Sequence, residues 1–468
     1  MKLENFERIS FLIFLLLFSF CGLSKNQVDH RNIHAILSSI SKKEGNENNH
    51  SSKKTNKNVD EISFVLYDLT QKKEFEKVDG LLTSYLNDPE HDKTLVNYIH
   101  AEQFIYKGNY NKAIESYLKV LNDEPNVIST SFKLAKAYLM VKNYVDALKQ
   151  YQKIRVRFAG KLTDKQKHIV DNSIENIEKR YRWQKNINFS MAYNSNIDQA
   201  QGGNKQYCAK GTCITGQPTR ASMVNNFYIS SSMVLPVHEQ HSWMQGITLS
   251  AVDYLHDDSK RKVTVHVNGG YQFEDNNKKL AIIPSGSVTW KNNQFHYYKI
   301  GGKGGGEVYP SPFFSIFAFI DVNKYHYNKT YTAHDGKEIV YSLGLIYIVN
   351  ANHKLIIKGS DASYNKLLES DSYNQHEISI SLFNHIHTSE FSHTIGYRKI
   401  KFNSYDGSLD TQRVDHFWYF KTQVNKTNFK ILHFLPSIYF NHQINNSSAE
   451  VIYSYKQSEF GVNFTKAF

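Results

Sequence analysis

The chain has 468 residues, a hydrophobic fraction of 40% and a formal net charge of +12 at pH 7. Past the N-terminus, no stretch is apolar for the ~20 consecutive residues that a membrane-spanning helix needs, which argues against a helical membrane protein. Aromatic residues form 14% of the chain, too many for a disordered protein, and the basic residues are scattered, which argues against a nucleic-acid partner.

Residues 1–24 have the pattern of a secretory signal peptide, with a positively charged start and an apolar run at 9–20. The run is too short to stop in a membrane, so we expect the mature protein to leave the cytoplasm. Small residues at the positions that signal peptidase reads allow cleavage after Cys21 or after Ser24. Lipidation of Cys21 is the alternative, which the bulky Phe20 before it disfavours.

Residues 25–60 are charged, rich in Asn, Ser and Lys, and almost free of aromatic residues. Such a segment cannot bury enough apolar surface to offset the loss of chain entropy, so it is predicted to be a disordered polar leader. From Glu61 the apolar residues recur at helical spacing, and we predict a helical domain over 61–185.

The helical domain repeats itself, because residues 142–144 resemble residues 108–110, which lie 34 positions earlier. A looser unit, one residue out of step, precedes them at 75–89. This period resembles the tetratricopeptide (TPR) repeat, of which three units make the minimum stable stack, and 163–182 predicts a terminal helix with Thr163 as its N-cap. The residues expected to pack between the paired helices are Ala101, Tyr110, Ala113, Tyr117, Ala135, Tyr144, Ala147 and Tyr151.

A TPR stack presents a concave surface that can hold a peptide or a protein segment, and its alternative role is that of a spacer. The predicted groove positions are polar residues on the helical repeats: Asn97, Gln103, Lys133 and Lys136.

From Trp183 onward the apolar period changes to two, in segments about ten residues long with aromatic residues near their ends. Examples of such faces are Ile187, Phe189, Met191 and Tyr193; Phe227, Ile229 and Met233; and Val263, Val265, Val267, Tyr271 and Phe273. An outer-membrane barrel turns these faces to lipid, whereas a soluble sandwich hides them, and the period alone allows both. The export signal and the large, even number of segments favour a barrel over 186–468.

Fourteen strands are predicted, near 187–196, 223–235, 243–254, 263–274, 280–291, 294–304, 312–326, 339–349, 353–364, 373–386, 390–402, 411–424, 428–442 and 455–468. Short and longer links alternate between them, and 291–294 is a tight exception. With the helical domain in the periplasm, the short links are predicted to be periplasmic turns and the longer ones surface loops. The glycine run at 301–306 predicts a bulge or a sharp bend.

The two cysteines of the longest predicted loop, Cys208 and Cys213, are predicted to form a disulfide because the chain is exported. The chain ends in an apolar alternation, Phe460, Val462, Phe464 and then Phe468. This end resembles the C-terminal signal that the barrel-assembly machinery reads in bacterial outer-membrane proteins.

No motif for catalysis is evident. The glycine run is not followed by the Lys-Ser/Thr and helix of a phosphate loop, and no nucleophile elbow is present. His238 and His241 have one residue too few between them for the metalloprotease motif. We therefore expect no enzyme activity, no catalytic residue, no cofactor and no metal site.

The overall plan and the first-strand passage 189–200, which contains Asn194-Ser195-Asn196-Ile197, resemble the surface lipoprotein assembly modulator (Slam) family, the outer-membrane component of type XI secretion. Asp198 stands where Asn is commoner in that family. The resemblance covers roughly 62–468.

The resemblance implies a barrel in the bacterial outer membrane, with its N-terminal domain in the periplasm, that brings lipoprotein or soluble protein cargo to the cell surface. The expected partners are that cargo, the barrel-assembly machinery and outer-membrane lipid, and the expected state is a monomer. The family also includes a factor that a nematode-gut symbiont needs to colonise its host, so a host-association role is a second expectation. The alternatives are an adhesin acting through 197–222 and 403–410, a polysaccharide-export barrel and a passive channel.

Overall fold

A computed structural model describes residues 57–203, 206–209, 212–255, 257–406 and 411–468. The predicted signal peptide, its cleavage sites at Cys21 and Ser24, and the predicted leader up to residue 56 lie outside the described residues. Within the described ranges, no helix combines the length and the apolar character that crossing a bilayer requires.

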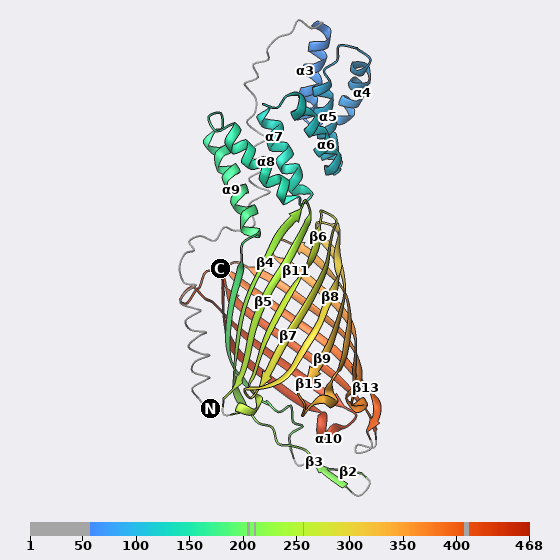
Figure 1. Ribbon diagram of the computed structural model, residues 1–468, viewed down its shortest axis with the longest axis vertical. Coiled ribbons are helices and arrows are strands. Elements are labelled where there is room, and N and C mark those ends of the chain that lie inside the picture. Colours follow the sequence, from blue (N-terminus) through green and yellow to red (C-terminus); the bar gives the residue numbers. More distant parts are fainter. Residues whose placement is uncertain (1–56, 204–205, 210–211, 256, 407–410) are drawn as a thin grey trace. The chain divides into compact units, whose positions relative to one another are not determined.

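The N-terminal part of the described chain is helical (Figure 1). Its helices are α3 (Lys57–Gln71), α4 (Phe75–Leu86), α5 (Lys93–Tyr106), α6 (Tyr110–Asp123), α7 (Ile128–Met140), α8 (Tyr144–Arg157) and α9 (Asp164–Arg180). Side-chain caps set several starts: Asp92 accepts from the backbone N–H of Thr94, and Thr163 forms a capping box with Gln166. The predicted terminal helix and its N-cap are thus confirmed.

The helices follow one another as hairpins, which confirms the predicted repeats. Each hairpin turns through one left-handed residue, Lys73 at φ 60°, Gly108 at φ 72° and Lys142 at φ 56°. The last two lie 34 residues apart, whereas the first two lie 35 apart, which accounts for the first unit being one residue out of step. Glycine adopts this backbone conformation most easily, but lysine occupies it twice here.

Small and aromatic residues fill the space between the paired helices, as predicted. The side chains at the repeat positions Ala101, Ala113, Tyr117, Ala135, Ala147 and Tyr151 are buried, and Tyr110 and Tyr144 pack against them. Alanine has no side chain beyond Cβ, so the helices can approach closely, and the tyrosine rings fill the remaining volume.

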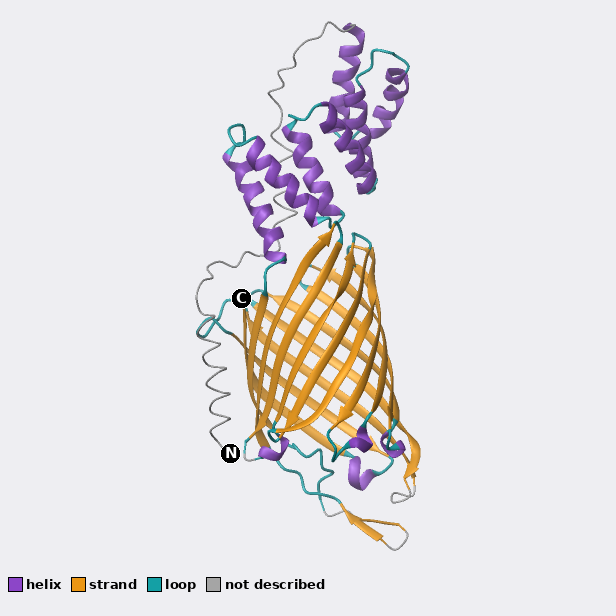
Figure 2. Ribbon diagram, viewed as in Figure 1, coloured by secondary structure: helices purple, strands orange, loops and turns teal. Residues whose placement is uncertain are grey.

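The rest of the chain forms a closed antiparallel β-barrel of fourteen strands (Figures 1 and 2). The first eight are β1 (Gln184–Asn194), β4 (Ser222–His238), β5 (His241–Tyr254), β6 (Lys262–Glu274), β7 (Lys278–Lys291), β8 (Gln294–Ser311), β9 (Phe314–Tyr327) and β10 (Gly336–Asn350). The others are β11 (His353–Lys366), β12 (Tyr373–Ile386), β13 (Ser389–Asp406), β14 (Thr411–Lys426), β15 (Leu435–Ser447) and β16 (Tyr455–Ala467). Pairing of β1 with β16 closes the barrel.

Alternate side chains point to opposite faces of each strand, and the register carries one face continuously around the barrel. The predicted faces meet on the outside: Phe189 pairs with Phe227, and Ile247 with Val267. Large apolar side chains such as Met191, Ile282 and Leu343 are exposed on this outer surface. An apolar outside is the arrangement of a transmembrane barrel rather than a sandwich, in which such residues would be buried.

The links differ between the two ends of the barrel, as predicted. At one end lie the short turns 239–240, 275–277, 312–313, 351–352 and 387–388. The longer link 427–434 also lies at this end, so the predicted short link between β14 and β15 was wrong. At the other lie the longer links 195–221, 255–261, 328–335, 367–372 and 448–454. The tight exception, now 292–293, is confirmed at the longer-link end, where two consecutive left-handed Asn residues form the reverse turn. We refer to the two ends as the turn end and the loop end.

Two details of the strand prediction were wrong. The strand predicted over 428–442 begins only at Leu435, because left-handed backbone at Leu432 and His433 forms a separate small turn within the link 427–434. The glycine run makes no bulge: Gly301 to Gly306 pair residue for residue with both β7 and β9. A Cβ at Gly301 would clash with the carbonyl oxygen of Val322, so glycine is needed for straight pairing.

Candidate functional site

The first helices of the three hairpins, α3, α5 and α7, share a row of polar and aromatic side chains. Tyr98 on α5 stacks on Tyr67 of α3 with ring centroids 5.8 Å apart. Its hydroxyl accepts a hydrogen bond from Gln71 Nε2 at 2.7 Å and another from the Lys133 ammonium of α7. The row therefore connects all three repeats through one buried hydroxyl.

An ion pair continues this row. The Lys133 ammonium lies 2.9 Å from the Glu102 carboxylate, which also accepts a hydrogen bond from Tyr117 at 2.5 Å. Burial alone would lower the pKa of Lys133, but the neighbouring Tyr98 and Glu102 outweigh it and hold the pKa above its usual value. Burial raises the pKa of Tyr98 to about 12, so its hydroxyl stays protonated at neutral pH. We call Tyr98, Glu102, Tyr117 and Lys133 the buried polar network.

The four predicted groove residues occupy different environments. Gln103 is buried and donates to Asp79 at 2.7 Å, and Lys133 belongs to the buried polar network. Asn97 is half-buried and Lys136 is exposed. Although the Lys136 side chain is exposed, partial desolvation of its ammonium group lowers its pKa, and the positive charge of Lys73 lowers this pKa further, so basic side chains gather here. Of the four, Lys136 offers the most accessible side chain to a partner.

Sequence reasoning did not single out Gln71, Tyr98 or Glu102 as members of this row. The sequence contained one signal for these residues, namely a polar residue beside a position that packs between the helices. Glu102, for example, comes one residue after the packed Ala101. Such a residue needs a partner on a neighbouring helix when it is buried, but the sequence does not identify that partner.

The inner wall of the barrel is polar and carries fixed charges. Arg398 Nε donates to Glu377 at 2.8 Å, and the same carboxylate accepts from the Tyr419 hydroxyl at 2.8 Å. Nearer the loop end, Arg413 lies 2.6 Å from the buried Asp415. Among the residues with described positions, no group of three or more His, Cys, Asp or Glu side chains could hold a metal ion.

The passage just after β1 folds back on the beginning of β16 through Asn196, whose side chain is 1% exposed. Its Nδ2 donates to the carbonyls of Ala200 at 2.7 Å and Lys456 at 3.0 Å, and its Oδ1 accepts from the N–H of Ala200 at 3.0 Å. Both polar atoms of this amide group, Nδ2 and Oδ1, are therefore hydrogen-bonded to backbone groups. These bonds hold the loop to the barrel at the seam between its first and last strands.

An ionic cluster fixes the next part of the same loop. Arg220 donates twice to Asp198, at 2.5 and 2.8 Å, and once to Asp257 at 2.7 Å, while Lys260 lies 2.7 Å from Asp198. The hydrogen bond from Arg220 is the main cause that holds the pKa of Asp198 well below its usual range, and Lys260 adds to it. An aspartate at position 198 thus serves as the acceptor for two basic side chains.

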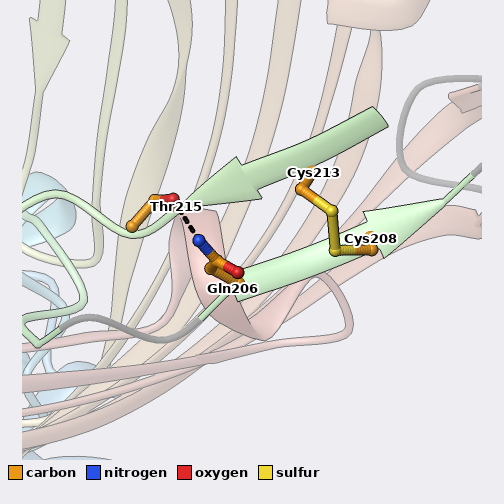
Figure 3. The surroundings of a disulfide bond; sticks show 4 residues. All are labelled: Gln206, Cys208, Cys213 and Thr215. Atoms are coloured by element: carbon orange, nitrogen blue, oxygen red, sulfur yellow. Dashed lines mark hydrogen bonds between the residues drawn. A yellow bond between two sulfur atoms is a disulfide. The ribbon is translucent and has the colours of Figure 1, made fainter. Parts of the chain in front are cut away.

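The same loop contains a small hairpin, β2 (Gln206–Ala209) and β3 (Thr212–Thr215), in which a disulfide joins Cys208 to Cys213 (Figure 3). Gln206 Nε2 donates to the Thr215 hydroxyl at 3.3 Å at the open end of the hairpin.

The last strand presents its predicted apolar residues outward. Phe460, Val462 and Phe464 pair with Tyr193, Met191 and Phe189 of β1, respectively. Phe460 is 55% exposed, and the terminal Phe468 is 39% exposed. Phe460, Val462 and Phe464 thus lie on the outer face of the barrel, next to the closing seam, whereas Phe468 follows the end of β16.

Comparison with known families gives two successive matches. Residues 183–468 match the family described as surface lipoprotein assembly modifier, and residues 48–151 match the N-terminal TPR repeats of that family. A surface lipoprotein assembly modifier of Moraxella catarrhalis is 24% identical over 331 residues, which are 69% of this chain and 63% of the relative. The chain thus covers less than two thirds of that relative's length.

Solved structures with some similarity are outer-membrane proteins. A bacterial polysaccharide outer membrane secretin is 10% identical with a TM-score of 0.34, over 60% of this chain and 98% of that one. The outer membrane channel DcaP of Acinetobacter baumannii is 9% identical with a TM-score of 0.35, over 61% of this chain and 96% of that one.

Proposed function

Because the chain belongs to the surface lipoprotein assembly modifier family, we propose that this outer-membrane barrel carries lipid-anchored protein cargo to the cell surface. The observation that carries the proposal is the order of the chain: a helical repeat domain, whose first helices offer accessible polar side chains such as Lys136, runs directly into β1 at the turn end. Turn ends of bacterial barrels face the periplasm, so the repeats would meet cargo before it crosses the membrane.

In this proposal the two parts of the chain have different tasks. The row on α3, α5 and α7 binds the cargo, or a chaperone that carries it, through accessible side chains such as Lys136 and Asn97. The barrel provides the polar inner wall along which a segment can pass. The barrel-assembly machinery is proposed to insert the barrel into the membrane by reading the end of the chain, including Phe464 of β16 and Phe468 after it.

The proposal is tested by the surface display of a co-expressed lipoprotein from the neighbouring gene. Antibody binding and protease access on intact cells are compared with and without this protein, and display is expected only when the protein is present. Equal display in cells with and without the protein would contradict cargo export, provided that the barrel is shown to be assembled in the cells that contain it. A direct contact with a host would then be favoured, through the disulfide-closed hairpin in the link 195–221.

Reversing the charge of Lys136 is expected to reduce cargo display about tenfold, because about 1.4 kcal/mol of binding energy corresponds to that factor. Lys136 is exposed, so Lys136→Glu should leave the amount of assembled barrel unchanged. The matched control is Lys119→Glu, the same change at an exposed position on α6, the second helix of its hairpin. Equal loss of display in both variants would remove the assignment of cargo binding to the first helices.

A further inference from the structure

The outer wall of strands β9 to β14 carries basic side chains close to the loop end. Four of them are exposed lysines that alternate with apolar outward residues such as Val322. We call them the basic rim: Lys324, Lys337, Lys399 and Lys401.

The register places two of these charges directly opposite each other and flanks a third with histidines rather than acidic residues. Lys324 and Lys337 lie directly opposite each other on β9 and β10. Lys399 of β13 lies opposite His376 on one side and His416 on the other. Cβ atoms of directly opposite residues are about 5 Å apart, so like charges at such positions destabilise a sheet.

Acidic residues do not offset this charge. On the outward face of the described residues of β9 to β14, the acidic side chain is Asp361, and it is hydrogen-bonded to His376. No ion pair joins a lysine of the basic rim to an acidic side chain within the described part of the chain. A mobile anion is therefore the partner that this arrangement lacks.

The height of the rim indicates which anion it meets. Outward aromatic side chains, Tyr341, Tyr397 and Trp418, lie on the turn-end side of the rim lysines and form part of an interfacial girdle. Aromatic girdles mark the level at which the acyl chains of lipids meet their headgroups. Lys337 and Lys399 lie beyond this level, toward the loop end, where lipid phosphates are found.

An apolar hollow lies against the same wall. It has a volume of about 980 Å³, and most of its lining residues face outward, among them Gly304, Ala318, Leu343, Gly359 and Ile378. Asp361 and His376 also line it, which places it next to the basic rim. The wall thus combines an apolar recess of the size of an acyl-chain segment with cationic groups beside it.

We propose that the basic rim and this hollow form a binding site for a phosphorylated lipid of the outer leaflet, of the lipopolysaccharide class. Phosphate groups would bridge the opposed lysines, and an acyl chain would occupy the hollow. Charge complementarity and the adjoining apolar recess favour such a lipid over a free anion, which would use the lysines alone. The site does not depend on the cargo proposal, because it faces the membrane and not the lumen.

The test uses the full-length protein in a non-ionic detergent and measures its unfolding temperature on semi-native gels. The protein is titrated with lipid A, with dephosphorylated lipid A and with inorganic phosphate. Lipid A is expected to raise the unfolding temperature at lower concentration than the other two. Replacing all four rim lysines with Gln should raise the half-saturating lipid A concentration by about fivefold for each lysine, and less in high salt.

A sign reversal distinguishes lipid binding from a structural role. Without lipid, Lys337→Gln removes the repulsion with Lys324 and should raise the unfolding temperature slightly. When saturating lipid A is added, the unfolding temperature of this variant should rise by less than that of the wild type. This single variant also serves if the fourfold variant does not assemble. The matched control replaces the lumen-facing Lys299, Lys303, Lys358 and Lys421 with Gln, which should leave the lipid A titration unchanged.

Three results would overturn the proposal. The first is that lipid A leaves the unfolding temperature of the wild type unchanged. The second is that inorganic phosphate raises this temperature as much as lipid A does, which would reduce the site to an ion site. The third is that the lumen control loses its response to lipid A as much as the rim variant does.

Discussion

Replacing Lys133 with Met is expected to destabilise the helical domain by about 1–3 kcal/mol, because it removes one partner of a partly buried ion pair and leaves the other charged. The Lys133 ammonium lies 2.9 Å from the Glu102 carboxylate, which is then left with the Tyr117 hydroxyl. The Tyr98 hydroxyl also loses a donor. Methionine fills a similar volume, so the loss of the charge and its hydrogen bonds is the main effect.

Limited proteolysis of the full-length protein in detergent measures this effect, with the protease-resistant barrel as the internal standard. The control is Lys136→Met, three residues further along α7 at an exposed position, which should cost less than about 0.5 kcal/mol. The double variant Lys133→Met/Glu102→Gln should recover part of the loss, because no unpaired charge then remains. Equal cleavage of Lys133→Met and Lys136→Met would show that the buried polar network contributes no stability.

This network also shows where sequence patterns stop. The helical period located the repeats and the alanines between the helices, because small residues at fixed spacing have one packing consequence. A lysine on a helix usually faces solvent, so Lys133 was assigned to an accessible groove. Its actual position depends on Tyr98 and Glu102 of another repeat, 35 and 31 residues away, and the pattern within α7 contains no trace of them.

In the barrel, alternation predicted which residues share one face of a strand, since a shift by one residue would invert every side chain. It located the start of β15 poorly because Phe429, Ile431 and Leu432 continue an apolar pattern in a link whose backbone has not yet entered the sheet. For the glycine run, the sequence pattern predicted an irregular strand where the structure has regular pairing. Glycine weakens a strand on average, but here its missing side chain permits close strand contact, which only the neighbouring strands reveal.

Asn196→Leu is expected to lower the unfolding temperature of the whole barrel, although only one side chain changes. The Asn196 amide binds the carbonyls of Ala200 and Lys456 and the N–H of Ala200. Leucine has a similar volume but leaves these three backbone groups unpaired in a site where the Asn196 side chain is 1% exposed. Each buried unpaired group costs about 1–3 kcal/mol, so the total loss is several kcal/mol.

The effect should spread because Lys456 belongs to β16, whose pairing with β1 closes the barrel. Semi-native gels run after heating give the unfolding temperature, and protease access to 195–221 reports release of the loop. Asn196→Asp has nearly the same shape and keeps an acceptor for the Ala200 N–H, but it loses both donors, so it should fall at least as far. Asn365→Leu on β11, where the side chain is exposed, is the control and should change little. If Asn196→Asp behaved like this control, shape rather than hydrogen bonding would hold the seam.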